Sequence, residues 1–130
     1  MYQVRQPAVA GAFYPGQASA LSNDVMAMLS EAASGSNKTA SVPKAIIVPH
    51  AGYIHSGSTA ALAYARLSGG RNTIRRVVLL GPVHRVPVRG LALPGVDGFA
   101  TPLGTVEVDQ VAVAAITPLP QVRVSRSQRA

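Results

Sequence analysis

Residues 44–50 have the sequence Lys-Ala-Ile-Ile-Val-Pro-His, and this stretch decides the predicted fold. The apolar run is short, carries β-branched residues and stops at a proline, so it predicts a strand buried on both faces. Residues 75–80, Arg-Arg-Val-Val-Leu-Leu, form a second run of the same kind, which Gly81-Pro82 closes. The two runs therefore predict two interior strands of one sheet.

The segment between these runs predicts a helix. It begins near Ser56 or Ser58, either of which can cap it, and extends to Leu67 before Gly69-Gly70 ends it. Strand, helix and strand at this spacing form a βαβ unit, in which the two strands are parallel neighbours. The predicted fold class is therefore α/β, with a parallel sheet and a βαβ crossover.

Further elements are predicted outward from this unit. Apolar residues recur at helical spacing between residues 18 and 33, at Leu21, Val25, Met28, Leu29 and Ala32. Residues 7–15 lie between prolines and predict a loop, and Ser34-Gly35-Ser36-Asn37 predicts a linker after the helix. Residues 91–93 predict a short strand, and residues 109–116 predict a short helix that Asp109 caps.

Composition limits the class of protein. The chain has 130 residues, enough for one core, and with 48% hydrophobic residues but only six Phe or Tyr that core should consist of small and medium side chains. It has no cysteine, which excludes disulfides, thiolate nucleophiles and cysteine-ligated zinc within this chain. The N-terminus lacks the apolar core of a signal peptide, and no apolar run is long enough to span a bilayer. We expect a cytoplasmic protein.

The net charge of +7 raises the question of nucleic-acid binding. The densest group of basic residues lies between residues 66 and 89, but no aromatic residue stands among its arginines from Arg71 to Arg89. Proteins that bind single strands place aromatic side chains among their basic residues for base stacking. Nucleic acid is therefore not the expected partner.

Two histidines follow the two predicted strands. His50 comes directly after the first, and His84 follows the second after three residues. In open parallel sheets ligands bind beyond the carboxyl ends of the strands, and neighbouring strands lie about 4.8 Å apart. We therefore expect the two imidazoles to converge on one metal ion or one substrate, with ring nitrogens about 3–4 Å apart when each binds the ion.

Each of these residues also has a structural interpretation. A histidine in such a loop is often a hydrogen-bonded surface or cap residue. His55 is compatible with a ligand, a supporting residue or plain surface, and Tyr53 with an acid, a hydrogen-bond donor or packing.

Several separated motifs follow one another along the chain. The first is Arg-Gln-Pro-Ala-Val-Ala-Gly-Ala-Phe-Tyr-Pro at residues 5–15, and the second is Pro-His-Ala-Gly-Tyr at 49–53. Further motifs are Ser56-Gly57, Ala60-Ala61, Ala63-Tyr64, Leu-Gly-Pro-Val-His at 80–84 and Thr-Pro-Leu-Gly-Thr-Val-Glu-Val-Asp at 101–109. In this order they resemble the motifs of the Memo family, whose bacterial members are also called AmmeMemoRadiSam system protein B.

The resemblance implies a three-layer fold similar to class III extradiol dioxygenases, which are non-haem iron enzymes. It implies that His50 and His84 line the pocket as metal ligands, together with a cysteine from the family's later half, and that iron or copper is the metal. From the residues themselves we add Tyr53 to His50 and His84 as a predicted catalytic residue. It also implies AMMECR-type and radical-SAM partner proteins.

The sequence departs from the family at three places. His55 stands where the family usually has tyrosine, Val83 stands where it has a small polar residue, and the family's later half is absent. Residues 1–124 are thus expected to be the N-terminal portion of a Memo-like domain and residues 125–130 an unrelated tail, as in a truncated chain. The candidate functions are a metal-dependent oxidoreductase, a non-catalytic ligand- or protein-binding component, and an inactive fragment.

Overall fold

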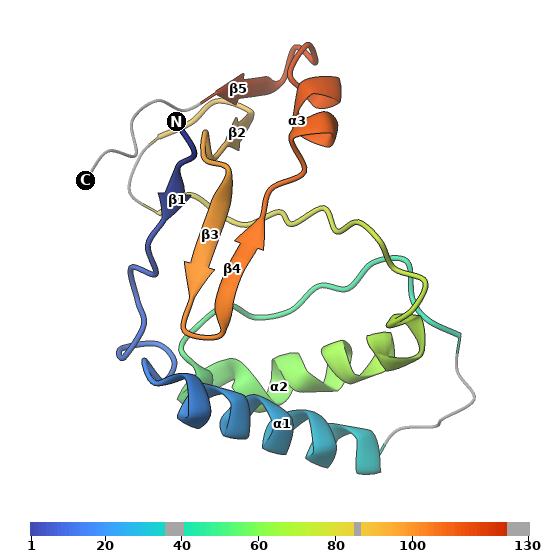
Figure 1. Cartoon of the computed structure of the whole chain (residues 1–130). Helices are drawn as coiled ribbons and strands as arrows, with labels where there is room; N and C mark the ends of the chain where they lie inside the picture. The colour runs from blue at the N-terminus through green and yellow to red at the C-terminus, as the bar shows by residue number, and fades with distance from the viewer. Residues whose placement is uncertain (36–40, 85–86, 125–130) are drawn as a thin grey trace. The chain divides into compact units, whose positions relative to one another are not determined.

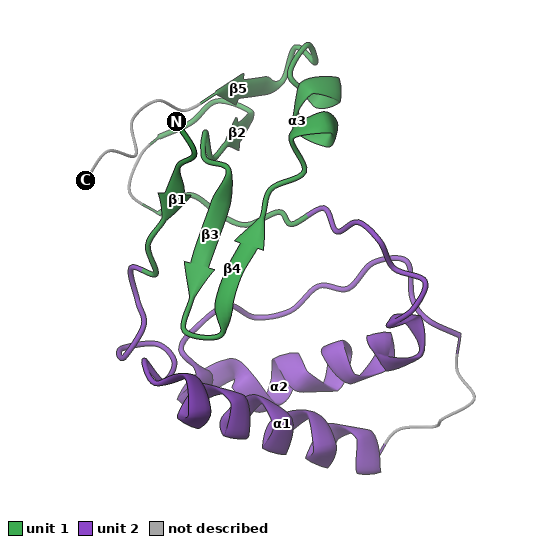
Figure 2. Ribbon diagram, viewed as in Figure 1, with its two compact units in different colours: residues 1–7, 79–130 green, residues 8–78 purple. Residues whose placement is uncertain are grey.

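The computed structural model describes residues 1–35, 41–84 and 87–124. The described residues form two compact units, coloured separately in Figure 2. Unit 1 consists of Met1–Pro7 and Leu79–Ala130, and unit 2 of Ala8–Val78. Unit 2 holds the long helices and unit 1 holds the strands (Figure 1).

In unit 2, helix α1 (Ala18–Ser34) confirms the predicted helix. Its buried and half-buried positions are those of the apolar stripe: Leu21, Val25, Met28, Leu29 and Ala32. Helix α1 packs against helix α2 (Tyr53–Tyr64), which continues into a 3-10 helix at Ala65–Gly70. Gly57 makes this packing close, because a Cβ there would lie 2.6 Å from the Met28 Sδ atom.

The predicted start of the second helix was wrong. Helix α2 begins at Tyr53 after an extended Gly52, with the Tyr53 amide donating to the Phe13 carbonyl at 2.8 Å. Ser56 does not cap the helix but lies buried within it, where its Oγ donates to the Ala51 carbonyl at 2.8 Å. The hydroxyl bonds backward along the chain, a pattern that serine also adopts inside helices.

Unit 1 contains two small sheets. Strands β1 (Val4–Arg5), β3 (Gly98–Thr101) and β4 (Gly104–Glu107) form one sheet in the order β1-β3-β4, with β1 parallel and β4 antiparallel to β3. Strands β2 (Leu91–Leu93) and β5 (Val122–Val124) form a parallel pair. A parallel pair needs a crossover connection, and here β3, β4 and helix α3 (Gln110–Ile116) supply it.

Two predicted elements of unit 1 are confirmed. Strand β2 matches the predicted strand at 91–93. Helix α3 has Asp109 as its N-cap, whose carboxylate accepts from the Ala112 amide at 2.9 Å. The α/β class with parallel strand pairing is thus confirmed.

The two decisive strands, however, were predicted wrongly. Neither residues 44–49 nor residues 75–80 form a strand, and in the described chain no strand lies between β1 and β2. Both runs are drawn as extended chain in Figure 1. A strand forms only where a neighbouring backbone segment pairs with it. An apolar sequence pattern does not show whether such a segment is present.

The core is small and lacks large side chains, as the composition predicts. Among the described residues, the buried hydrophobic side chains are Leu21, Ala32, Ala61 and Val122. By contrast, the run at residues 77–80 is almost fully exposed, with Val77 at 76%, Val78 at 80%, Leu79 at 85% and Leu80 at 73%. These four residues therefore form an exposed apolar segment rather than the predicted buried strand.

Gly90 provides a test of the β2–β5 pairing. Its φ is +91°, and a Cβ there would clash with the Gln121 carbonyl oxygen, which accepts a hydrogen bond from the Leu91 amide. We expect Gly90→Ala to destabilise unit 1 by about 1–3 kcal/mol, measured by urea unfolding followed by circular dichroism. Gly81→Ala is the control, because no atom lies within 4 Å of its Cβ position. Equal stability of the two variants would contradict the tight turn.

Candidate functional site

Tyr53 and His50 lie around the N-terminus of helix α2 in unit 2. His50 is exposed and directly follows the apolar run at 44–49, whereas Tyr53 is the first helical residue and is half-buried. The Tyr53 amide is fixed by the Phe13 carbonyl, and the Tyr53 ring lies against Tyr14, with ring centroids 5.8 Å apart. The loop at residues 8–15 therefore positions the start of the helix.

That loop is itself held by backbone hydrogen bonds. The Gly11 amide donates to the Tyr14 carbonyl at 2.8 Å, and the Phe13 amide donates to the Val9 carbonyl at 2.9 Å. Gly52 lies against the same loop, since a Cβ on it would come within 3.4 Å of the Phe13 carbonyl oxygen. Two segments of unit 2 that are distant in sequence, residues 8–15 and 52–53, thus lie against each other.

The environment of Tyr53 favours its protonated form. Burial raises the pKa of the Tyr53 phenol above its ordinary value, and the neighbouring Tyr14 and Tyr64 raise this pKa further. Because the ordinary pKa of tyrosine is already about 10, the phenol keeps its proton at neutral pH. It can therefore act as a hydrogen-bond donor.

The remaining histidines lie elsewhere. His55 is exposed on helix α2, where its amide donates to the Gly52 carbonyl at 2.9 Å. His84 is exposed and belongs to unit 1, whereas His50 belongs to unit 2. The convergence of His50 and His84 stays a prediction, and the pair of parallel strands that first supported it is absent from the described chain.

The histidines fit a metal ion in donor type but not in number. Imidazole nitrogens suit iron, copper and zinc, and an oxygen-activating site normally adds a third protein ligand. Within the described residues, no group of three or more His, Asp or Glu side chains is placed to hold an ion. A complete metal site would need further ligands in addition to His50 and His84.

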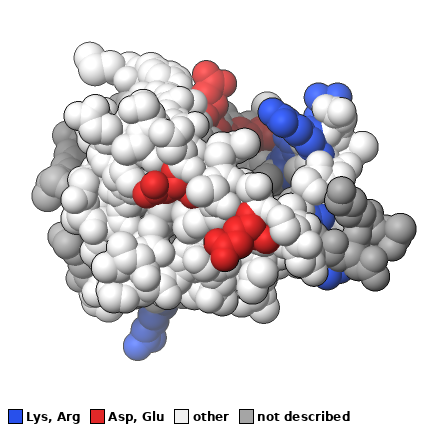
Figure 3. Space-filling view, turned by 90° about the horizontal axis from the view of Figure 1, so that it is seen from below, with Lys and Arg blue, Asp and Glu red and all other residues white. Residues whose placement is uncertain are grey.

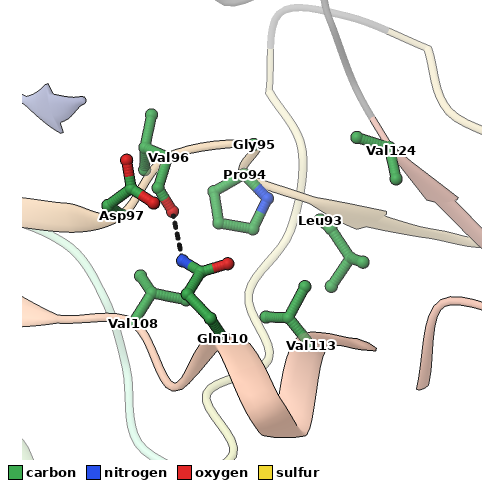
Figure 4. Close-up of a pocket in the computed structure, with 9 residues that line it drawn as sticks. All are labelled: Leu93, Pro94, Gly95, Val96, Asp97, Val108, Gln110, Val113 and Val124. Carbon is green, nitrogen blue, oxygen red and sulfur yellow. Dashed lines mark hydrogen bonds between the residues drawn. The ribbon is translucent and has the colours of Figure 1, made fainter. Parts of the chain in front are cut away.

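A pocket of about 240 Å³ lies in unit 1, and none of the predicted site residues lines it (Figure 4). Its wall is mainly apolar, and its polar groups are already engaged. The Gln110 Nε2 donates to the Val96 carbonyl at 3.3 Å, and the Asp97 Oδ2 accepts from the Gln3 amide at 2.7 Å. The pocket therefore offers no catalytic set of its own.

Charge and hydropathy add two findings. On the face shown in Figure 3, most residues are uncharged, and the charged side chains lie in small separate groups. No helix in the described parts of the chain is both long and apolar enough to cross a bilayer.

Together, these features define an α/β protein in which the loop at 8–15 fixes a histidine- and tyrosine-bearing helix N-terminus. The model of the family described as "Memo-like protein" matches residues 5–129, and the chain belongs to this family.

Three relatives illustrate the match. The chain is 43% identical over 107 residues to a MEMO1 family protein of Aquifex aeolicus, 40% identical over 106 to Protein MEMO1 of Xenopus laevis and 38% identical over 106 to Protein MEMO1 of Homo sapiens. Each match covers 82% of this chain, but only 37% of the Aquifex protein and 34% of the two others. The chain thus spans about a third of the length of these relatives.

The raised pKa of Tyr53 can be tested by titration. Because the folded chain binds this proton more tightly than the unfolded chain, its stabilising contribution is complete below about pH 10 and is lost as the pH rises through the raised pKa. Absorbance at 295 nm should show phenolate forming at higher pH in the folded chain than in urea. Tyr53→Phe should reduce this difference; an unchanged difference would contradict the effect of burial.

Proposed function

We propose that this chain contributes two metal ligands, His50 and His84, to a Memo-type redox pocket in the cytoplasm. The observation that carries the proposal is membership of the Memo-like family, since the match includes both histidine motifs. Iron or copper, when bound, would exchange electrons with a substrate. The chain's own residues have simpler roles: the two imidazoles hold the ion, and the Tyr53 phenol donates a hydrogen bond to the substrate.

The geometry around His50 supports these roles. His50 is an exposed residue and lies three residues before Tyr53, which begins helix α2. The Phe13 carbonyl and the Tyr14 ring fix the position of Tyr53. A donor that is already oriented loses little conformational freedom when it acts on a ligand. The phenol is therefore suited to donate a hydrogen bond beside a histidine ligand.

A second candidate function is a binding component without turnover. The exposed apolar run at residues 77–80 favours it, because apolar patches on soluble proteins commonly mark interaction sites. In this alternative the chain holds a ligand or a partner protein through the same fold.

Metal binding distinguishes these functions. Isothermal titration calorimetry with Fe(II) under anaerobic conditions, and separately with Cu(II), should show weak binding, because this chain supplies two imidazoles. His50→Ala and His84→Ala should each reduce the affinity by about tenfold or more, since even residues that only support a ligand contribute that much.

His55→Ala is the matched control. His55 is exposed like the other two histidines but lies on helix α2, outside the proposed ligand pair. Its replacement should leave binding unchanged. Equal losses in all three variants, or no loss in His50→Ala and His84→Ala, would assign the bound metal to other surface sites and refute the proposed pair.

A further inference from the structure

The pocket in unit 1 has the size of a small-molecule site. The nine residues drawn around it in Figure 4 all belong to unit 1, so its walls do not depend on how the two units are placed. Its volume is about 240 Å³. A cavity of about 150 Å³ is enough to bind benzene, whereas drug-sized ligands occupy about 300 Å³ or more. The pocket therefore has room for a compound of one or two fused rings.

Hydrogen bonds hold two sides of this pocket in place. On one side, the Asp97 amide donates to the Gln3 carbonyl at 2.8 Å, and the Asp97 carbonyl accepts from the Val108 amide at 2.9 Å. On the other side, the ladder of strands β2 and β5 pairs Leu93 with Val124. Walls that are already fixed lose little conformational freedom when a ligand binds.

Gln110 presents a hydrogen-bond acceptor to this pocket. Its Nε2 donates to the Val96 carbonyl, and Figure 4 shows its Oε1 turned away from Val96, toward the side where Leu93 and Val113 lie. Among the described residues, none donates a hydrogen bond to this oxygen. An occupant that carries an N–H or O–H group would satisfy it, and an occupant without such a group would leave it unpaired.

The walls also indicate the charge and polarity of the occupant. Most of the lining side chains are apolar, and burial of apolar surface is the main favourable term in such a pocket. A charged ligand would lose its hydration on entry, and an anion would also be repelled by the Asp97 carboxylate. A neutral ring compound meets neither cost.

We propose that this pocket binds a small, neutral ring compound with one N–H or O–H group, which donates a hydrogen bond to the Gln110 Oε1 atom. The ring itself packs against the apolar walls. His50, Tyr53 and His84 do not line the pocket, so this site is independent of the proposed metal ligands.

The test compares two ligands on the full chain. Indole is the probe, and benzofuran is its matched control, because it has nearly the same shape but no N–H group. In a ¹H–¹⁵N NMR titration, indole should shift the amide signals of residues 93–97 and 110–113. It should bind about threefold or more tightly than benzofuran, because one net hydrogen bond changes a binding constant by about two- to tenfold.

Three variants locate the site. Val113→Phe should weaken indole binding by about tenfold or more, because the larger side chain fills the pocket. Val111→Phe is its control and should leave binding unchanged, since Val111 lies on the same helix α3 but is 78% exposed and does not line the pocket. Gln110→Leu should abolish the preference for indole over benzofuran while retaining an apolar wall.

Each ligand and each variant can contradict the proposal. It is wrong if indole shifts no amide of the pocket, if Val113→Phe binds indole as tightly as Val111→Phe, or if Gln110→Leu keeps the full preference for indole. Gln110 is exposed, so its replacement decides the question even if Val113→Phe fails to fold. Signals that shift only around His50 and Tyr53 would place the probe in unit 2 and would equally refute this site.

Discussion

An apolar strand in an α/β protein is stable only when its backbone is paired and both of its faces are covered, and this constraint governs the whole chain. In unit 2, the two helices cover each other, since helix α1, which carries the apolar stripe from Leu21 to Ala32, packs against helix α2. In unit 1, backbone hydrogen bonds join five short strands into two sheets. Residues 77–80 have neither a packed helix over their side chains nor a paired strand beside their backbone. These four apolar residues thus do not belong to the buried core of the described chain.

The helices could be predicted from sequence because their signals are local. The stripe of helix α1 and the Asp109 cap of helix α3 depend only on residues within one or two turns. The start of helix α2 was missed because its determinant is distant: the Phe13 carbonyl fixes the Tyr53 amide across 40 residues. The sequence pattern predicted a serine cap at Ser56 or Ser58, whereas the extended Gly52 precedes the helix.

The strands could not be predicted in this way, because their formation depends on distant residues. Residues 44–49 and 75–80 had the strongest pattern but form no strand, because pairing depends on a partner that an apolar run cannot specify. The hairpin of β3 and β4 was not predicted, although Pro102-Leu103-Gly104 is a turn signal. Its turn is held by the Thr101 hydroxyl, which donates to the Gly104 carbonyl at 2.8 Å, and by a φ of +128° at Gly104.

The residues of the candidate site stay a prediction, whereas the surroundings of Tyr53 needed the structure. His50, Tyr53 and His84 were identified from the sequence, and their motifs lie within the residues that the family model matches. The contact of the loop at 8–15 with the start of helix α2, and the raised pKa of Tyr53 that follows from burial there, needed the structure. Long-range contacts of this kind leave no periodic signal in a single sequence.

Hydrogen–deuterium exchange of the isolated chain, resolved by mass spectrometry, tests the central claim most directly. Amides that make no hydrogen bond exchange at nearly the rate of an unfolded chain, whereas those inside packed helices exchange more slowly. The structure predicts rapid exchange at residues 77–80 and slower exchange in helices α1 and α2. Protection of residues 77–80 equal to that of the helices would show that the run is already paired, and would contradict this account.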